Sequence, residues 1–260
     1  MRLHISAISR SAISRAAFAV LIAGSALASS AQSAPQWDYE GRNGPLLWSK
    51  QDPAWKACNK GEQQSPIDIR GAKLNKALQP IELHYVAGPV TLVNDGHTVR
   101  VNVDPVSFIV VDGTRYDLVS YEFHHPSEHT VKSKLSDMEV DLIHKSADGK
   151  EAILGVLFDE TIGNANATLA SLWPHLPRSA GRTDKVTDMV NAGGLLPADR
   201  GYWTYEGSEL TPPCTEGVKW FVFENPVSIS RDQYNAFANL YKLNSRPLQV
   251  PHGRKIEANE

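Results

Sequence analysis

Acidic and histidine side chains recur at alternating positions in two nearby stretches of this chain. Glu122 and His124 lie in the first, Tyr121–Thr130, and Asp141 lies in the second, Met138–His144. Side chains alternate between the two faces of a strand, so Glu122 and His124 point to the same side. If the two stretches are neighbouring strands, Asp141 joins them. Nitrogen and oxygen donors that converge in this way have the layout of a zinc site.

The donor types decide what chemistry such a site could support. Two ionised carboxylates would neutralise most of the charge of a divalent ion, so its bound water would be less acidic. They would also favour harder cations, such as manganese or magnesium, although a mixed set of histidine and carboxylate still holds zinc in some hydrolases. The alternative is that no metal binds, and that Glu122, His124 and Asp141 satisfy one another through hydrogen bonds and ion pairs.

The composition predicts one soluble globular domain. The chain has 260 residues, of which 42% are hydrophobic and 21% are charged, and its formal net charge is −3. A chain of this length can bury a sizeable core. No basic bias points to nucleic acid, and no long run of charge indicates an interaction tail.

The first 31 residues have the pattern of a secretory signal peptide. A positively charged start precedes an apolar run, Ala16–Ala28, and small residues follow, so we expect cleavage between about residues 28 and 34. The run is too short for a comfortable membrane span. An N-terminal anchor or a disordered leader is the alternative. The mature domain is expected to cover 32–260, to lack a membrane span and to be periplasmic or secreted.

The rest of the chain favours β-structure. A loop-rich segment, 35–66, precedes short apolar runs that are separated by turn residues such as Asp112-Gly113 and Asp148-Gly149. These hairpin signals favour antiparallel pairing over βαβ units. Helical patterns are few, at 165–173 and after a capping box at Ser230–Gln233. The expected strands are 99–103, 107–111, 116–124, 139–144, 152–158 and 219–223.

Several motifs, in order along nearly all of the predicted mature chain, resemble those of the alpha-class carbonic anhydrases. They are Trp37–Tyr39, Asn43–Pro45, Gln64–Ile69, Asn94–His97, Pro126–Thr130, Tyr202–Tyr205, Thr211–Cys214 and Gly217–Trp220. The resemblance implies a mainly β, single-domain fold: a large, twisted, mostly antiparallel sheet with short surface helices and a central conical cavity.

The resemblance also implies a reaction, the reversible hydration of carbon dioxide at zinc. Three neutral imidazoles leave zinc its full charge, which lowers the pKa of bound water to about 7, an effect for which carbonic anhydrase is the standard example. In the family a threonine hydroxyl, oriented by a glutamate, aligns the hydroxide, and a histidine carries the proton to solvent. Glu128 matches that glutamate and His97 matches that histidine.

The chain departs from the family at the positions that carry this reaction. The three ligand positions are occupied by Glu122, His124 and Asp141. The threonine position is Leu210, whose side chain cannot hydrogen-bond, although Thr211 would supply a hydroxyl if the loop shifts. Glu209 adds an acid to the cavity wall, unless it is a solvated loop residue. His97 is likewise either a proton carrier or an exposed turn histidine.

Neighbouring positions differ as well. A cavity-wall position of the family is Arg100 here. Glu139 matches the family but would face Asp141, and adjacent carboxylates resist joint ionisation, so at least one of their pKa values is expected to rise. His125 and His144 fall on the opposite faces of their strands and are interpreted as structural.

The two cysteines, Cys58 and Cys214, are predicted to form a disulfide. In an oxidising compartment a pair so far apart usually does so, and the bond would stabilise the fold by roughly 3–5 kcal/mol on the chain-entropy model. The alternative is two buried thiols in a chain that stays in the cytoplasm. The resemblance favours the bond, because bacterial members carry a disulfide at these positions.

Three functions fit these residues. The first is an enzyme with altered lyase or hydratase chemistry on a small substrate, with carbon dioxide hydration weak or lost, because the replacements are polar and converge. The second is a catalytically silent exported protein that binds a small molecule in the cavity. The third is a zinc carbonic anhydrase with a remodelled site. The cofactor would be one divalent metal, zinc by resemblance or a harder cation such as manganese, or none.

Overall fold

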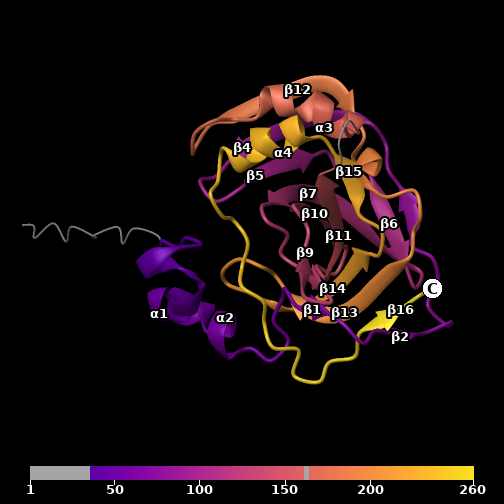
Figure 1. The fold of residues 1–260 in the computed structure, drawn as a ribbon. Coiled ribbons are helices and arrows are strands. Elements are labelled where there is room, and N and C mark those ends of the chain that lie inside the picture. The colour runs from indigo at the N-terminus through magenta and orange to yellow at the C-terminus, as the bar shows by residue number, and fades with distance from the viewer. Residues whose placement is uncertain (1–35, 161–163) are drawn as a thin grey trace, which may run out of the picture. The chain divides into compact units, whose positions relative to one another are not determined.

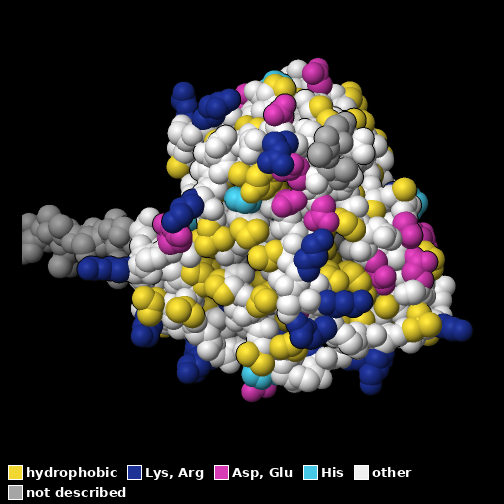
Figure 2. Space-filling view, viewed as in Figure 1, with side chains coloured by type: hydrophobic (Ala, Val, Ile, Leu, Met, Phe, Trp, Pro, Cys, Tyr) yellow, Lys and Arg dark blue, Asp and Glu magenta, His cyan; other side chains and the backbone are white. Residues whose placement is uncertain are grey.

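The computed structural model describes residues 36–160 and 164–260, and the predicted signal peptide lies outside them. None of the helices in the described residues is long and apolar enough to cross a membrane. The described strands form two sheets, which Figure 1 shows with the short helices around them. On the face shown in Figure 2, Lys and Arg side chains are interspersed with Asp and Glu, in keeping with the small net charge of −3.

The larger sheet contains 13 of the described strands, and most of its pairs are antiparallel. Its main path runs β12–β4–β5–β7–β10–β11–β14–β13–β16–β2, while β3, β6 and β15 pair beside that path. Parallel pairing joins β11 to β14 and β15, and β16 to β2. The strands are β2 (Lys73–Leu74), β3 (Glu82–His84), β4 (Gly88–Asn94), β5 (Val99–Val103), β6 (Phe108–Val111), β7 (Thr114–His124), β10 (Met138–Ser146), β11 (Glu151–Glu160), β12 (Thr183–Val190), β13 (Tyr202–Ser208), β14 (Glu216–Phe223), β15 (Val227–Ile229) and β16 (Glu257–Ala258).

The smaller sheet and the helices surround this framework. The sheet contains β1 (Asp68–Ile69), β8 (Thr130–Val131) and β9 (Lys134–Leu135). The α-helices are α1 (Trp48–Gln51), α2 (Ala57–Lys60), α3 (Ala167–Leu172) and α4 (Arg231–Ala238). The predicted capping box is confirmed at the start of α4, where the side chains of Ser230 and Gln233 bond each other's backbone. Single 3₁₀ turns lie at 41–43, 45–47, 53–55, 173–175 and 192–195.

The register of the central strands positions the site. In the antiparallel pair of β7 and β10, Glu122 lies opposite Asp141 and His124 lies opposite Glu139. Residues opposite each other share a face of the sheet, so these four side chains project to the same side. The predicted adjacency of the two stretches is therefore confirmed.

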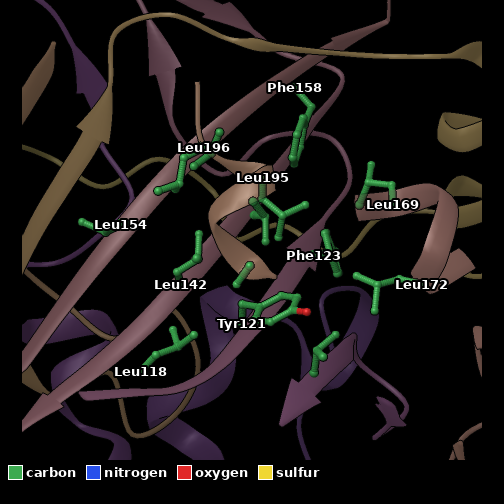
Figure 3. Close-up of a cluster of buried hydrophobic side chains, with 14 of the residues drawn as sticks. Leu118, Tyr121, Phe123, Leu142, Leu154, Phe158, Leu169, Leu172, Leu195 and Leu196 are labelled. Atoms are coloured by element: carbon green, nitrogen blue, oxygen red, sulfur yellow. The ribbon is translucent and has the colours of Figure 1, made fainter. Parts of the chain in front are cut away.

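The other face of the same strands forms the main hydrophobic core. Figure 3 shows Tyr121 and Phe123 of β7 and Leu142 of β10 packed with Leu169 and Leu172 of α3. All five side chains are fully buried. Burying an apolar side chain of this size contributes roughly 1.5–3 kcal/mol, so this layer holds the central strands in a fixed register behind the site.

A second apolar cluster lies on the site's own face. It includes Ile153, Leu157, Trp220 and Val222 from β11 and β14, together with Leu210. Leu210 is 7% exposed. Apolar side chains thus surround Glu122, His124 and Asp141, which are all buried from bulk water.

The predicted disulfide is confirmed. Cys58 and Cys214 are bonded, with their Cα atoms 5.0 Å apart, and they pack with Tyr39 and Trp48. The segment 35–66, predicted as loops and short turns, also contains the four-residue helices α1 and α2. Helices of about one turn are too short to leave a recognisable period in the sequence.

Candidate functional site

A cavity of about 540 Å³ lies over the central strands. Its floor is formed by Glu122, His124 and Asp141, and Glu209, Leu210 and Thr211 belong to its wall. The other lining residues are Arg100, Asn102, Val119, Ser120, Ile143, Lys145, Glu151, Ile153 and Pro212. The structure therefore brings the three predicted ligand residues and two of the predicted catalytic residues to one cavity.

Glu122 is engaged by an arginine from the neighbouring strand. The Arg100 Nε–H donates to Oε1 of Glu122 at 2.6 Å, and the Glu122 side chain is only 10% exposed. A second carboxylate, Asp95, lies 3.8 Å from Arg100 Nη2. Glu122 raises the pKa of Arg100, in spite of an opposing effect of partial burial. The pairing is a charge-assisted hydrogen bond, the stronger kind.

His124 is held from behind by two oxygen atoms. Its Nδ1–H donates to the Asn244 carbonyl at 2.8 Å, and Oε1 of Glu128 lies 3.0 Å from the same nitrogen. The imidazole is 2% exposed. Burial lowers the pKa of His124, but Glu128 outweighs it through its charge and its hydrogen bond, with smaller contributions from Asp141 and the Asn244 carbonyl, and the pKa is raised to about 10. The ring is therefore expected to carry a proton at neutral pH, with Nε2 directed towards Asp141.

Asp141 is a buried carboxyl without a hydrogen-bond partner among the described residues. Its side chain is 3% exposed, and its Oδ2 lies 3.5 Å from Nε2 of His124. Burial and the charge of Glu139 raise the pKa of Asp141 well above its usual value, as the adjacency of two carboxylates predicted. Both of its oxygens are fully buried, and their nearest polar neighbours are the carboxylate of Glu139 and the ring of His124.

Glu139 connects Asp141 to a second buried network. Its carboxylate accepts hydrogen bonds from the backbone N–H of His129 at 2.8 Å and from His129 Nδ1 at 2.7 Å. The other ring nitrogen of His129 lies 2.7 Å from the hydroxyl of Tyr205. Burial raises the pKa of Glu139, but His129 has the larger combined effect and lowers it. Opposite Asp141 in β11 stands Gly155, where an added Cβ would lie 2.9 Å from Glu139 Oε1, so glycine leaves room for this carboxylate.

The floor does not fit a resident metal ion as the side chains stand. Within residues 36–160 and 164–260, no three His, Cys, Asp or Glu side chains are grouped to hold one. The carboxylate of Glu122 is directed to Arg100, whereas His124 Nε2 and Asp141 lie beside each other. Of these three residues, only His124 and Asp141 lie close enough to pair with each other, and Glu122 pairs with Arg100 instead of with either of them. The assignment of the three residues as ligands stays a prediction.

The predicted catalytic residues occupy different depths. Glu128 lies behind His124, where its Oε2 accepts a hydrogen bond from the backbone N–H of Arg246. Glu209 is at the wall, and its Oε2 accepts from the Thr215 backbone N–H at 3.2 Å. Thr211 lines the cavity beside Leu210. Glu128 is thus paired with the imidazole that it supports.

His97 is held against the N-terminal segment. Its ring stacks on Trp37 with a centroid distance of 3.7 Å, and its Nε2 lies 2.9 Å from the Trp37 carbonyl oxygen. It is not among the residues that line the cavity. A proton-carrying role for His97 would require this stacked ring to turn, and it stays a prediction.

The histidines interpreted as structural lie away from the cavity. His144 Nδ1–H donates to the Leu142 carbonyl, and burial lowers the pKa of His144 to about 4. His125 contacts the Asp137 carbonyl through Nδ1 at 3.2 Å.

The sequence analysis missed the ion pair between Arg100 and Glu122, and also the pair of Lys145 and Glu151 at 2.7 Å. The strand register would have revealed both pairs, but it was not predicted for β5 or for the outer part of β11.

Comparison with known proteins identifies the family. The model for the eukaryotic-type carbonic anhydrase matches residues 43–260. A carbonic anhydrase from Klebsiella pneumoniae is 38% identical over 226 residues, which are 86% of this chain and 91% of that protein. The chain therefore belongs to the alpha carbonic anhydrase family.

Two solved structures extend the comparison. The alpha-carbonic anhydrase from Thermovibrio ammonificans, in complex with the inhibitor sulfanilamide, aligns with a TM-score of 0.83 and 37% identity over 86% of this chain and 99% of that one. Dioscorin complexed with ascorbate aligns with a TM-score of 0.80 and 30% identity, over 86% of this chain and 97% of that one. The predicted fold class is thus confirmed.

The buried charges predict how stability depends on pH. The free energy of unfolding is expected to fall as the pH rises from about 7 to about 10. His124 has a pKa of about 10 when folded, whereas an unfolded histidine has about 6.5, so its stabilising effect is complete below about 6.5 and is lost through about 10. Asp141 acts with the same sign but from a lower pH, because its raised pKa makes the folded chain hold a proton that the unfolded carboxyl loses at about pH 4. Urea unfolding at several pH values measures the slope.

Two variants test whether this slope comes from His124. His124→Gln removes the titrating group, and the fall above pH 7 is expected to become shallower. His144→Gln is the matched control, because the lowered pKa of His144 has the opposite sign and acts only between about 4 and 6.5. An unchanged slope above pH 7 in His124→Gln would contradict the assignment.

Proposed function

We propose that this protein catalyses a hydratase- or lyase-type reaction on a small polar substrate in the cavity, and that its carbon dioxide hydration is weak or lost. His124 and Asp141 are the acid–base pair at the floor, and Thr211 and Glu209 contact the substrate from the wall. We also propose that the chain is exported, which its disulfide supports, because such bonds persist in oxidising compartments.

The buried carboxyl of Asp141, which among the described residues has only Glu139 and the His124 ring beside it and makes no well-formed hydrogen bond, carries this proposal. A buried polar group without a hydrogen bond lowers the stability of the fold by roughly 1–3 kcal/mol. Such a group brings the protein no advantage unless a ligand bonds to it. The pKa values of Asp141 and His124 are both raised, so the two groups share protons at neutral pH, and the pair can both give up a proton and take one back. Groups with shifted pKa values that converge in a cavity are typical of catalytic sites.

Carbon dioxide hydration is proposed to be weak because the groups that the family uses are replaced. Glu122 is paired with Arg100, and the wall position that would carry the aligning hydroxyl is the buried, apolar Leu210. Glu122 cannot replace a neutral imidazole ligand, because Arg100 already neutralises its charge. Leu210 cannot replace the threonine, because its side chain has no hydrogen-bonding atom.

Metal content and hydration rate, measured on one sample, test the proposal. The mature protein is purified without chelators, its metals are determined by mass spectrometry, and hydration is followed by stopped flow. We expect far less than one zinc per chain and a rate close to that of buffer. One zinc per chain together with fast hydration would instead support a zinc carbonic anhydrase with a remodelled site.

A second candidate is a binding protein without catalysis. The similarity to dioscorin favours it, because that protein was solved with ascorbate. Calorimetric titration with ascorbate, for the wild type and for Asp141→Asn, distinguishes the candidates. Binding that weakens in Asp141→Asn, with all the ascorbate recovered unchanged, favours a binding protein, whereas consumption of the ascorbate favours an enzyme. Glu82→Gln is the control, because Glu82 lies on β3 outside the cavity lining.

A further inference from the structure

Arg100 meets Glu122 where β5 and β7 pair. The two residues are directly opposite each other in the antiparallel register. The guanidinium donates from Nε to the carboxylate at 2.6 Å, and both side chains line the cavity. The chain therefore supplies its own cation to the carboxylate at the floor of the cavity.

We propose that Arg100 takes the place of a metal ion in this cavity, and that by occupying Glu122 it keeps Glu122, His124 and Asp141 from forming a divalent cation site. The inference rests on the proposed function, because both assume that Glu122, His124 and Asp141 act without a bound metal. It goes further by assigning the exclusion of metal to one residue.

The other two donors lie next to each other in this structure, and each must release its proton before it can bind a cation. Nε2 of His124 faces Asp141 at 3.5 Å, and both oxygens of Asp141 lack hydrogen-bond partners among the described residues. Once the imidazole has lost the proton on Nε2, a nitrogen and a carboxylate so close together can share one cation, whose bonds to such donors are about 2.0–2.2 Å long. Only Glu122 is occupied, and its partner is Arg100.

Charge makes the exclusion strong. A guanidinium stays protonated under all ordinary conditions, so Arg100 cannot give way to a cation by losing its proton. A divalent ion on Glu122 would have to lie within a few ångströms of that charge, in a partly buried place where screening is weak. Removal of the guanidinium is expected to strengthen metal binding by about 100- to 1,000-fold.

The test is metal binding by the full-length mature protein and by Arg100→Gln. Each sample is dialysed free of metal and titrated in a calorimeter with zinc chloride and with manganese chloride, and bound metal is then counted by mass spectrometry. We expect no stoichiometric binding by the wild type and one equivalent in Arg100→Gln. The double variant Arg100→Gln/Glu122→Gln is expected to lose most of that binding.

Lys145→Gln is the matched control. Lys145 lines the same cavity and pairs with Glu151 at 2.7 Å, so this variant removes an equal charge without freeing Glu122. It is expected to behave like the wild type. Arg100→Lys keeps the charge and should also exclude metal. Arg100 is 44% exposed, so these variants are expected to fold, and near-ultraviolet circular dichroism checks that they do.

Two results would overturn the inference. One is a folded Arg100→Gln, or a folded Arg100→Asn as a second variant, that binds no more metal than the wild type. The other is a wild-type protein that binds one zinc as tightly as Arg100→Gln. The first result leaves the proposed function intact, because the wild type would still lack metal, whereas fast hydration by the wild type would refute the proposed function.

Discussion

Zinc-dependent hydration of carbon dioxide is expected to appear in this protein when four residues are exchanged together. The variant is Arg100→Asn/Glu122→His/Asp141→His/Leu210→Thr. It removes the guanidinium, provides three imidazole positions on β7 and β10, and restores a hydroxyl to the wall. Three neutral imidazoles leave a zinc ion the full charge that makes its water acidic. We expect one zinc per chain and a hydration rate at least about 100-fold above that of the wild type.

The backbone supports this expectation. The register already places positions 122, 124 and 141 on one face, and His124 is already oriented by the Asn244 carbonyl. Gly155 leaves space opposite position 141, where Glu139 would accept a hydrogen bond from an introduced imidazole. The main chain therefore needs no rearrangement.

Partial variants show which change matters. The variant that lacks only Leu210→Thr is expected to bind zinc but to hydrate carbon dioxide more slowly, because nothing aligns the nucleophile. The variant that lacks only Arg100→Asn is expected to bind zinc more weakly. If the wild type hydrates carbon dioxide as fast as the fourfold variant, the side chains now at these positions do not weaken the reaction, and the expectation is wrong.

The central strands could be predicted because their signals are local. Strands 99–103, 116–124 and 139–144 match β5, β7 and β10 to within two residues. Their alternation determines which residues share a face, and it therefore predicts that Glu122, His124 and Asp141 lie together, as the register confirms. β12 was not predicted. Only two of its eight residues are buried, Val186 and Val190, and they are four residues apart, so no period of two is visible.

The pairing partners within the site could not be predicted in the same way. Both the metal site and the internally paired floor were consistent with Glu122, His124 and Asp141. The difference depends on Arg100, which lies on a strand whose register against β7 is set by long-range packing. The stacking of His97 on Trp37 likewise joins residues that are 60 positions apart. Local patterns contain no information on such contacts, whereas they do determine the faces of each strand.

Loss of the disulfide is expected to cause the largest fall in stability of any single change. Cys58 and Cys214 are separated by 156 residues, so the bond removes a large loop entropy from the unfolded chain. The chain-entropy model gives roughly 3–5 kcal/mol for such a bond, which is a large part of the usual 5–15 kcal/mol of a domain. Urea unfolding of the double variant Cys58→Ser/Cys214→Ser, compared with the wild type, measures the loss.

The effect should reach the candidate site through Arg246. Its Nη2 donates to the Cys58 carbonyl at 2.7 Å, and its backbone N–H donates to Glu128, the carboxylate behind His124. The double variant is therefore expected to show weaker protection of the Arg246 amide in hydrogen exchange, in addition to its lower free energy of unfolding.

The single variant Cys58→Ser separates the bond from the packing of the two sulfur atoms. If the bond is the cause, the single variant, the double variant and the reduced wild type all lose a similar free energy of unfolding, because each has lost the same cross-link. If the double variant loses less than about 1 kcal/mol, the unfolded chain is already compact around this loop, and the entropic account fails. In that case the apolar cluster of Tyr39 and Trp48 would be what holds the N-terminal segment in place.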